Sequence, residues 1–132
     1  MTVVGMIEQY NLERPNSVED NVKKEFLRKC EANIIDSVIL LYEPKEGEMT
    51  MEELEEHLDN FGYDTELIVK EPYDDIYIQF LDQRISLNNN DKARYNMAAR
   101  LFDNTFLVFK QKYNREHFPR QTRKMLLRHE VL

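Results

Sequence analysis

The 132-residue sequence contains few of the residues that build covalent, metal-bound or turn-rich scaffolds. Its single cysteine, Cys30, excludes an internal disulfide and a cysteine-based zinc site, and we expect synthesis in a reducing, intracellular compartment. Three glycines and four prolines are too few for an all-β sandwich and exclude the usual glycine-rich phosphate loops. The apolar run that ends at Tyr42 is interrupted at once by Glu43, so the sequence predicts no membrane span, and its N-terminus predicts no secretory signal.

The net charge of −7 is distributed unevenly along the chain. Residues 1–75 contain 7 Lys or Arg and 20 Asp or Glu, a net charge of −13, whereas residues 76–132 contain 11 and 5, a net charge of +6. The extremes are −11 over residues 43–75 and +5 over residues 110–132. This polarity favours head-to-tail self-association, or an acidic surface beside a basic arm. The alternative is a solvated acidic helix and a loose basic tail.

Apolar residues at spacings of 3 and 4 predict helices through the first half of the chain. We expect a short helix near residues 3–10, a long helix over residues 17–42 and a short acidic helix at about 50–61. Thr50 and Glu53 have the spacing of a capping box, which would begin the acidic helix.

The second half predicts an antiparallel helical hairpin over residues 72–88 and 91–115. Pro72 suits the first position of its first helix, and Gly62 suits a left-handed cap after the acidic helix. Residues 63–71 lack a helical period, so we expect an irregular loop pinned on the helices. The predicted fold is therefore all-α, a small helical bundle built on this hairpin and followed by a basic C-terminal arm.

The predicted organisation is one helical domain over residues 1–118 and an arm over residues 119–132. An aromatic line in the last helix repeats at spacings of 3 and 4, which favours a core position over a ligand pocket. Truncating one of these phenylalanines should cost about 3–5 kcal/mol. The expected core residues are Phe26, Val38, Ile76, Phe80, Tyr95, Phe102, Phe106 and Phe109.

No group of residues in the sequence predicts catalysis. His57, His117 and His129 lie far apart without a partner four residues away, which argues against a helical metal pair. His57 stands among carboxylates, which we interpret as a solvated helix face rather than a metal site. Cys30 has no base near it on its helix face and most simply fills space. We therefore expect no catalytic residues, no metal, no cofactor and no enzymatic activity.

The C-terminal arm combines basic residues with an apolar kernel, Met125-Leu126-Leu127. Such a kernel favours anchoring in a groove of a partner protein, with Arg and Lys pairing with carboxylates at the rim. A phosphate-binding arm and a frayed terminus are the alternatives. The expected partner-interface residues are Arg115, His117, Arg120, Gln121, Arg123, Lys124, Leu126 and Leu127.

Five short strings occur in a characteristic order. They are Glu13-Arg14-Pro15-Asn16, Asp64-Thr65-Glu66-Leu67-Ile68-Val69, Pro72-Tyr73-Asp74-Asp75-Ile76-Tyr77, Arg94-Tyr95-Asn96, and Tyr113-Asn114-Arg115 with His117-x-Pro119-Arg120-Gln121. The set resembles the small head–tail connector proteins (adaptor or head-completion proteins) of tailed phages and prophages of Firmicutes. The resemblance covers residues 1–121, and the acidic stretch 44–62 looks like an extension of a shorter acidic loop.

The resemblance implies a structural virion protein, made in the bacterial host cytoplasm and located in the neck of the particle. It implies a homo-oligomeric ring of twelve copies between the portal protein and a tail-completion protein. Genomic DNA would pass through the channel without sequence-specific binding, and no membrane would be involved. The implied ring-interface or structured-loop residues are Glu66, Leu67, Val69, Tyr73 and Tyr77. The channel-facing acidic candidates, which would repel DNA, are Glu52, Glu53, Glu55 and Glu56.

Two other functions fit the same sequence. The acidic segment could make the chain a phage-encoded regulatory protein, either a nucleic-acid mimic or an inhibitor of a host enzyme. Residues 110–132, with basic groups beside aromatic ones, could instead bind DNA, and that binding would weaken steeply with salt.

Overall fold

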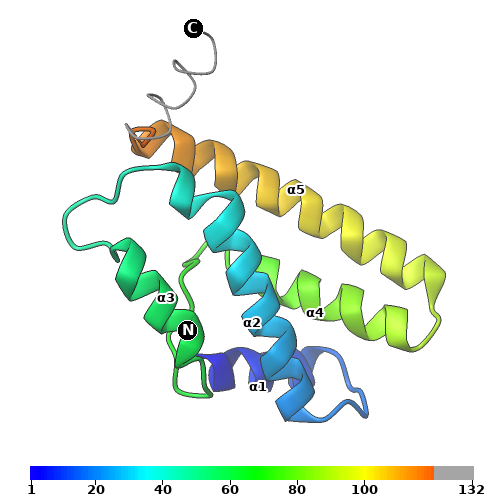
Figure 1. The fold of residues 1–132 in the computed structure, drawn as a ribbon. Coiled ribbons are helices and arrows are strands. Elements are labelled where there is room, and N and C mark those ends of the chain that lie inside the picture. The colour runs from blue at the N-terminus through cyan, green and yellow to red at the C-terminus, as the bar shows by residue number, and fades with distance from the viewer. Residues whose placement is uncertain (121–132) are drawn as a thin grey trace, which may run out of the picture.

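The computed structural model describes residues 1–120, which form a helical bundle (Figure 1). The α-helices in this part of the chain are α1 (Val3–Glu13), α2 (Asp20–Ser37), α3 (Met51–Asp59), α4 (Asp75–Asn88) and α5 (Lys92–Glu116), and a 3-10 turn, η1 (Ile39–Leu41), follows α2. Extended pairing within this range is confined to two isolated bridges, Thr2 with Glu66 and Tyr42 with Pro119. The prediction of an all-α fold is confirmed. Over the same residues, no helix has the length and apolar character that crossing a membrane requires.

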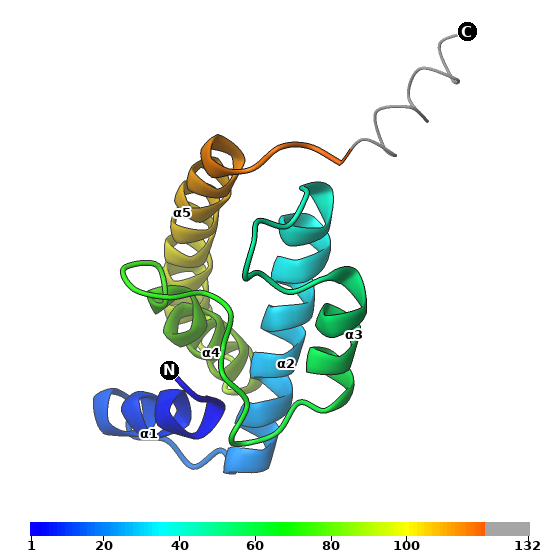
Figure 2. The same cartoon turned by 90° about the vertical axis from the view of Figure 1, so that its left-hand side faces the viewer.

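The antiparallel hairpin of α4 and α5 is the framework on which the other helices are placed (Figure 1). Its turn is short because Asn90 adopts a positive φ of 56° and the Asp91 side chain accepts a hydrogen bond from the Arg94 amide, which caps α5. Helix α2 packs on α4, and α3 packs on the other side of α2 (Figure 2). The hairpin and α3 therefore lie on opposite sides of α2.

The hydrophobic core lies between α1, α2, the α4–α5 hairpin and the segment that connects α3 to α4. Val38, Ile76, Phe80, Phe102 and Phe109 are buried, as expected for core residues. Two other expected core residues, Phe26 and Phe106, are partly buried and pack against this core. Tyr95 is also only partly buried, because it lies in the first turn of α5 beside the exposed stretch 87–94.

Several local boundaries differ from the predictions. Helix α2 ends at Ser37 and the 3-10 turn η1 follows it, so the helix is shorter than the predicted range of residues 17–42. Pro72 does not begin a helix: it follows a cis peptide bond, and α4 starts at Asp75. Gly62 is not a left-handed cap, because α3 already ends at Asp59 and its C-cap residue is Asn60, with a φ of −103°. The capping box of Thr50 and Glu53 is present as predicted.

Candidate functional site

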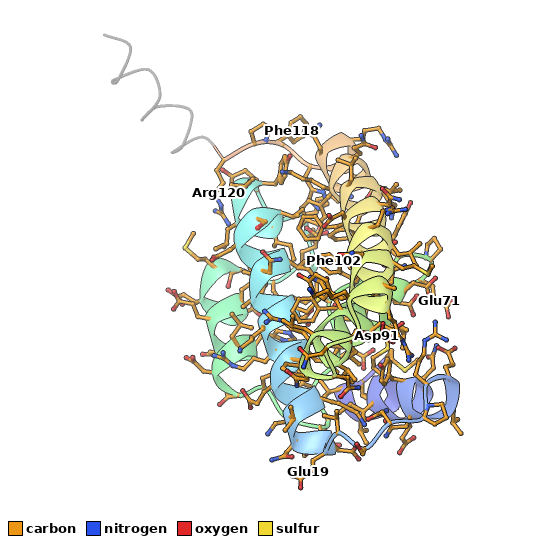
Figure 3. The ribbon with its side chains drawn as sticks, turned by 90° about the vertical axis from the view of Figure 1, so that its right-hand side faces the viewer. Glu19, Glu71, Asp91, Phe102, Phe118 and Arg120 are labelled. Atoms are coloured by element: carbon orange, nitrogen blue, oxygen red, sulfur yellow. The ribbon has the colours of Figure 1, made fainter. Side chains whose placement is uncertain are left out.

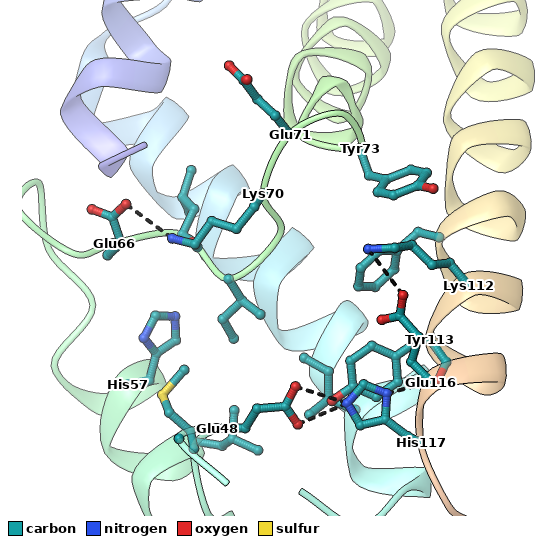
Figure 4. A pocket seen from close by; sticks show the side chains of 17 residues that line it. Glu48, His57, Glu66, Lys70, Glu71, Tyr73, Lys112, Tyr113, Glu116 and His117 are labelled. Carbon is teal, nitrogen blue, oxygen red and sulfur yellow. Dashed lines mark hydrogen bonds and ion pairs between the residues drawn. The ribbon is translucent and has the colours of Figure 1, made fainter. Parts of the chain in front are cut away.

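A cavity of about 510 Å³ opens between α5, α3 and the segment that connects α3 to α4 (Figure 4). Its apolar wall comes from elements that are far apart in the sequence, since Ile39, Leu54, Leu67, Ile68 and Phe109 all line it. Cavities of about 300–1,000 Å³ with mainly apolar walls are the usual sites for small ligands or for inserted side chains. We call this cavity the cleft.

Most of the charged side chains around the cleft are paired with one another, and Glu71 is exposed to solvent. Lys70 Nζ lies 3.1 Å from Glu66 Oε1, and Lys112 Nζ lies 3.6 Å from Glu116 Oε1 (Figure 4). His117 and Glu48 form the third pair. In these pairs each charged side chain around the cleft is matched by an opposite charge from the same chain. The cleft is therefore better suited to an apolar group than to acid–base chemistry. Among residues 1–120, no three His, Cys, Asp or Glu side chains converge as a metal site would require.

One wall of the cleft is held by a buried carboxylate, Glu31 on α2. Glu31 Oε2 accepts a hydrogen bond from the Ile68 amide at 3.0 Å and lies 2.8 Å from His57 Nε2. Glu31 Oε1 accepts a hydrogen bond from the Tyr77 hydroxyl at 2.5 Å, and that hydroxyl oxygen accepts one from the Val69 amide at 3.0 Å. Burial, reinforced by the Glu31 charge, raises the pKa of Tyr77 well above its ordinary value and keeps the hydroxyl protonated as a donor.

Glu31 is the residue that sequence reasoning missed. The available signal was its place beside Cys30, four residues after Leu27 and three before Ile34, on the side of the helix where the apolar residues recur. The interpretation of His57 as part of a solvated face is wrong for the same reason. Its side chain is only 9% exposed because it reaches inward to the Glu31 carboxylate.

The loop residues that the sequence singled out have different environments. Leu67 and Val69 are buried in a structured loop and Tyr77 is buried in the first turn of α4, so in this conformation none of the three is accessible to another copy of the chain. Tyr73 is half-buried, and its ring centroid lies 6.1 Å from that of Phe109. The exposed Glu66 carboxylate accepts hydrogen bonds from the terminal amine of Met1 and from Lys70, which together lower its pKa. These contacts tie the N-terminus to the loop.

Residues 117–120, which follow α5, are hydrogen-bonded to η1 and the residues just after it (Figure 3). The His117 ring is buried and stacks on Tyr113 at 3.7 Å between centroids. Arg120 Nε donates to the Leu40 carbonyl oxygen at 2.6 Å, and the Arg120 amide donates to the Leu41 carbonyl oxygen. The sequence predicted that His117 and Arg120 contact a partner; in this structure the His117 ring is buried and Arg120, which is partly buried, is hydrogen-bonded to the same chain.

The other expected partner-interface residues are divided between two parts of the chain. Arg115 is exposed in the last turn of α5. Gln121, Arg123, Lys124, Leu126 and Leu127 lie outside the described residues. The four acidic candidates for the channel, Glu52, Glu53, Glu55 and Glu56, are all exposed on α3.

A tight turn over residues 45–48 places the Glu48 carboxylate beside the His117 ring. Gly47 has a φ of +86°, which side chains rarely tolerate, and the Lys45 amide donates to Glu48 Oε1 at 2.9 Å. His117 Nε2 lies 2.9 Å from both carboxylate oxygens of Glu48. Partial burial acts to raise the pKa of Glu48, but the hydrogen bonds from Lys45 and His117 outweigh it and lower the pKa below its ordinary value of 4.5.

Glu48 should therefore contribute to the acid sensitivity of the fold. A lowered folded-state pKa means that this stabilisation is fully present above about pH 4.5 and is lost as the pH falls through the folded-state pKa. We expect Glu48→Gln to flatten the loss of stability between pH 5 and pH 3, as measured by urea unfolding at a series of pH values. Glu46→Gln, an exposed neighbour in the same turn, is the control and should leave the wild-type profile unchanged. A Glu48→Gln profile that matches the wild type would contradict this role.

The chain has no match among protein-family models, curated protein sequences or solved structures.

Proposed function

We propose that this protein is a structural subunit of a head–tail connector, which forms a ring between the portal and the tail of a tailed phage or prophage. DNA would pass through the ring, and the subunit would itself carry out no chemistry. The proposal is supported by the position of the five resembling strings in the fold. Their side chains or backbone form hydrogen bonds or ion pairs between elements that are distant in the sequence, and we call each such group of contacts a joint.

The first joint is a buried carboxylate on α4, Asp82. Arg14, from the first string, donates from Nε to Asp82 Oδ2 at 3.0 Å, and Tyr10 donates its hydroxyl to Oδ1 at 2.9 Å. Arg94, from the fourth string, places Nη2 3.5 Å from Oδ1. One carboxylate thus joins α1, α4 and α5, and a charge-assisted hydrogen bond at a buried site is sensitive to the geometry of all three helices.

The remaining strings form two further joints. The second and third strings supply the loop and Tyr77, which close around Glu31 on α2. The last string supplies Asn114, whose Oδ1 accepts the Tyr42 hydroxyl at 2.9 Å, and Arg120, which is bonded to η1. The strings therefore lie where a substitution would disturb the packing of two or more elements, which supports interpreting them together as one set and not as separate chance matches.

Portal binding tests the proposal. The purified chain, mixed with the portal protein encoded in the same genome, should form a complex in which electron microscopy shows a ring on one end of the portal. Leu126→Asp with Leu127→Asp should abolish this binding, since a charge in an apolar anchor is strongly unfavourable. Leu12→Asp, at an exposed site on α1, is the matched control and should bind normally. Absence of any portal complex with the wild-type chain would overturn the proposed function.

A further inference from the structure

The side of α5 that faces away from the bundle is apolar and basic. Met97, Leu101, Leu107 and Val108 are each about half-exposed or more. Three of them, at positions 97, 101 and 108, fall on one line along the helix, with the exposed Asn104 between the last two and Arg100 beside the line. Single exposed apolar residues are ordinary, but a stripe of about 17 Å on one helix marks an interaction surface. We call it the α5 outer face.

The outward side of α3 has the opposite charge and a similar length. Glu52, Glu55, Glu56 and Asp59 are exposed there, and Met51 adds an exposed apolar group at the start of the helix. Helix α3 contains no Lys or Arg, and its one histidine points inward to Glu31. Nine residues of helix extend about 13 Å, close to the length of the α5 stripe. We call it the α3 outer face.

Helices α3 and α5 lie on opposite sides of α2 in both ribbon views (Figures 1 and 2), and the exposed residues of each helix point away from the residues that it buries. One copy of the chain therefore cannot bring them together. Two copies can, because each presents a face that complements the opposite face of the next. A contact between two different surfaces is heterologous, and it repeats from copy to copy until a ring closes or a filament forms.

We propose that the α5 outer face of one copy docks on the α3 outer face of a second copy. The apolar stripe would pack beside Met51, and Arg100 would pair with the carboxylates of α3. This inference deepens the proposed function, since it names the contact that would join the subunits of the ring. It also assigns the acidic helix to the boundary between copies, whereas the resemblance implied the channel.

Two complementary variants of the full chain test this contact without any portal protein. Met97→Asp with Leu101→Asp disables the α5 outer face, and Glu55→Lys with Glu56→Lys disables the α3 outer face. Analytical ultracentrifugation should show concentration-dependent oligomers for the wild type and at least tenfold weaker self-association for each variant alone. Mixed in equal amounts, the variants should form a discrete one-to-one dimer, because one retains α3 and the other retains α5.

Matched controls and a second α5 variant keep the test independent of folding. Leu12→Asp on α1 controls for a new exposed acid, and Glu8→Lys with Asp36→Lys controls for the reversed charges. Both controls should associate like the wild type. Arg100→Glu reverses a charge on the α5 outer face without removing an apolar contact, and it should also weaken association, with circular dichroism reporting whether each variant is folded.

Three results would overturn the inference. One is a wild-type chain that stays monomeric at its highest soluble concentration. Another is an α3 variant that still self-associates while the α5 variant does not, which would mean that α5 pairs with α5. The third is a mixture of the two folded variants that forms no dimer. A chain that associates as expected but does not bind portal would retain this contact and lose the proposed function.

Discussion

We expect Phe102→Ala to lower the free energy of unfolding by about 3–5 kcal/mol, the cost of truncating a buried aromatic side chain and leaving a cavity. Phe102 is 8% exposed, and its ring centroid lies 5.5 Å from that of Phe80 on α4 and 5.7 Å from that of Phe106 on α5. The substitution therefore removes the aromatic contact between Phe80 of α4 and Phe102 of α5, which holds the two helices of the hairpin together. Since small domains are stable by only about 5–15 kcal/mol, urea unfolding should show a large shift of the midpoint.

An exposed leucine outside both proposed contact faces is the control for this change. Leu12 is 86% exposed on α1, so Leu12→Ala should change the free energy of unfolding by no more than about 0.5 kcal/mol. Equal losses from the two substitutions would mean that α5 does not pack on α4 through its aromatic face.

The second large effect should come from Glu31→Ala. The substitution leaves the Ile68 amide, the Tyr77 hydroxyl and the His57 ring without their shared acceptor inside the protein. A buried donor left without an acceptor costs about 1–3 kcal/mol, so losing the acceptor of two or three such donors should cost several kcal/mol. We expect urea unfolding to show this loss, and hydrogen exchange at the Ile68 and Val69 amides to accelerate more than exchange within α4.

Two other glutamate substitutions isolate the cause. Glu25→Ala removes a carboxylate that is 61% exposed on the same helix, so it should change stability by about 0.5 kcal/mol or less. Glu31→Gln keeps one acceptor oxygen and should fall between Glu31→Ala and the wild type. If Glu31→Ala leaves exchange at Ile68 and Val69 unchanged, the carboxylate does not hold the loop.

Much of the fold follows from local patterns. The hairpin could be predicted because the aromatic spacing of α5 and the Asn-Asp turn before it lie within one stretch of sequence. The capping box of α3 needs only Thr50 and Glu53, three residues apart. Pro72 shows where such reasoning fails, since a proline suits both a helix start and a loop, and only packing chooses between them.

The candidate site could be predicted only in part. The burial of Leu67 and Val69 follows from their apolar character and the lack of helical period around them. The partners of Glu31 do not, because His57 and Tyr77 lie 26 and 46 residues away from it along the chain. From the sequence alone, a glutamate in a helix is predicted to be exposed to solvent. Only the fold shows that three donors converge on the Glu31 carboxylate and allow it to be buried.

The sequence by itself determined that this chain forms helices, where most of them lie, and that its charge is divided between two halves. Each of these properties depends on residues within one or two turns of one another, or on composition alone. The tertiary structure decided that Glu31 is a buried acceptor, that His117 and Arg120 are hydrogen-bonded within their own chain, and that α3 and α5 lie on opposite sides of α2. Those properties depend on contacts between distant segments, and no local pattern specifies which distant side chain will be near.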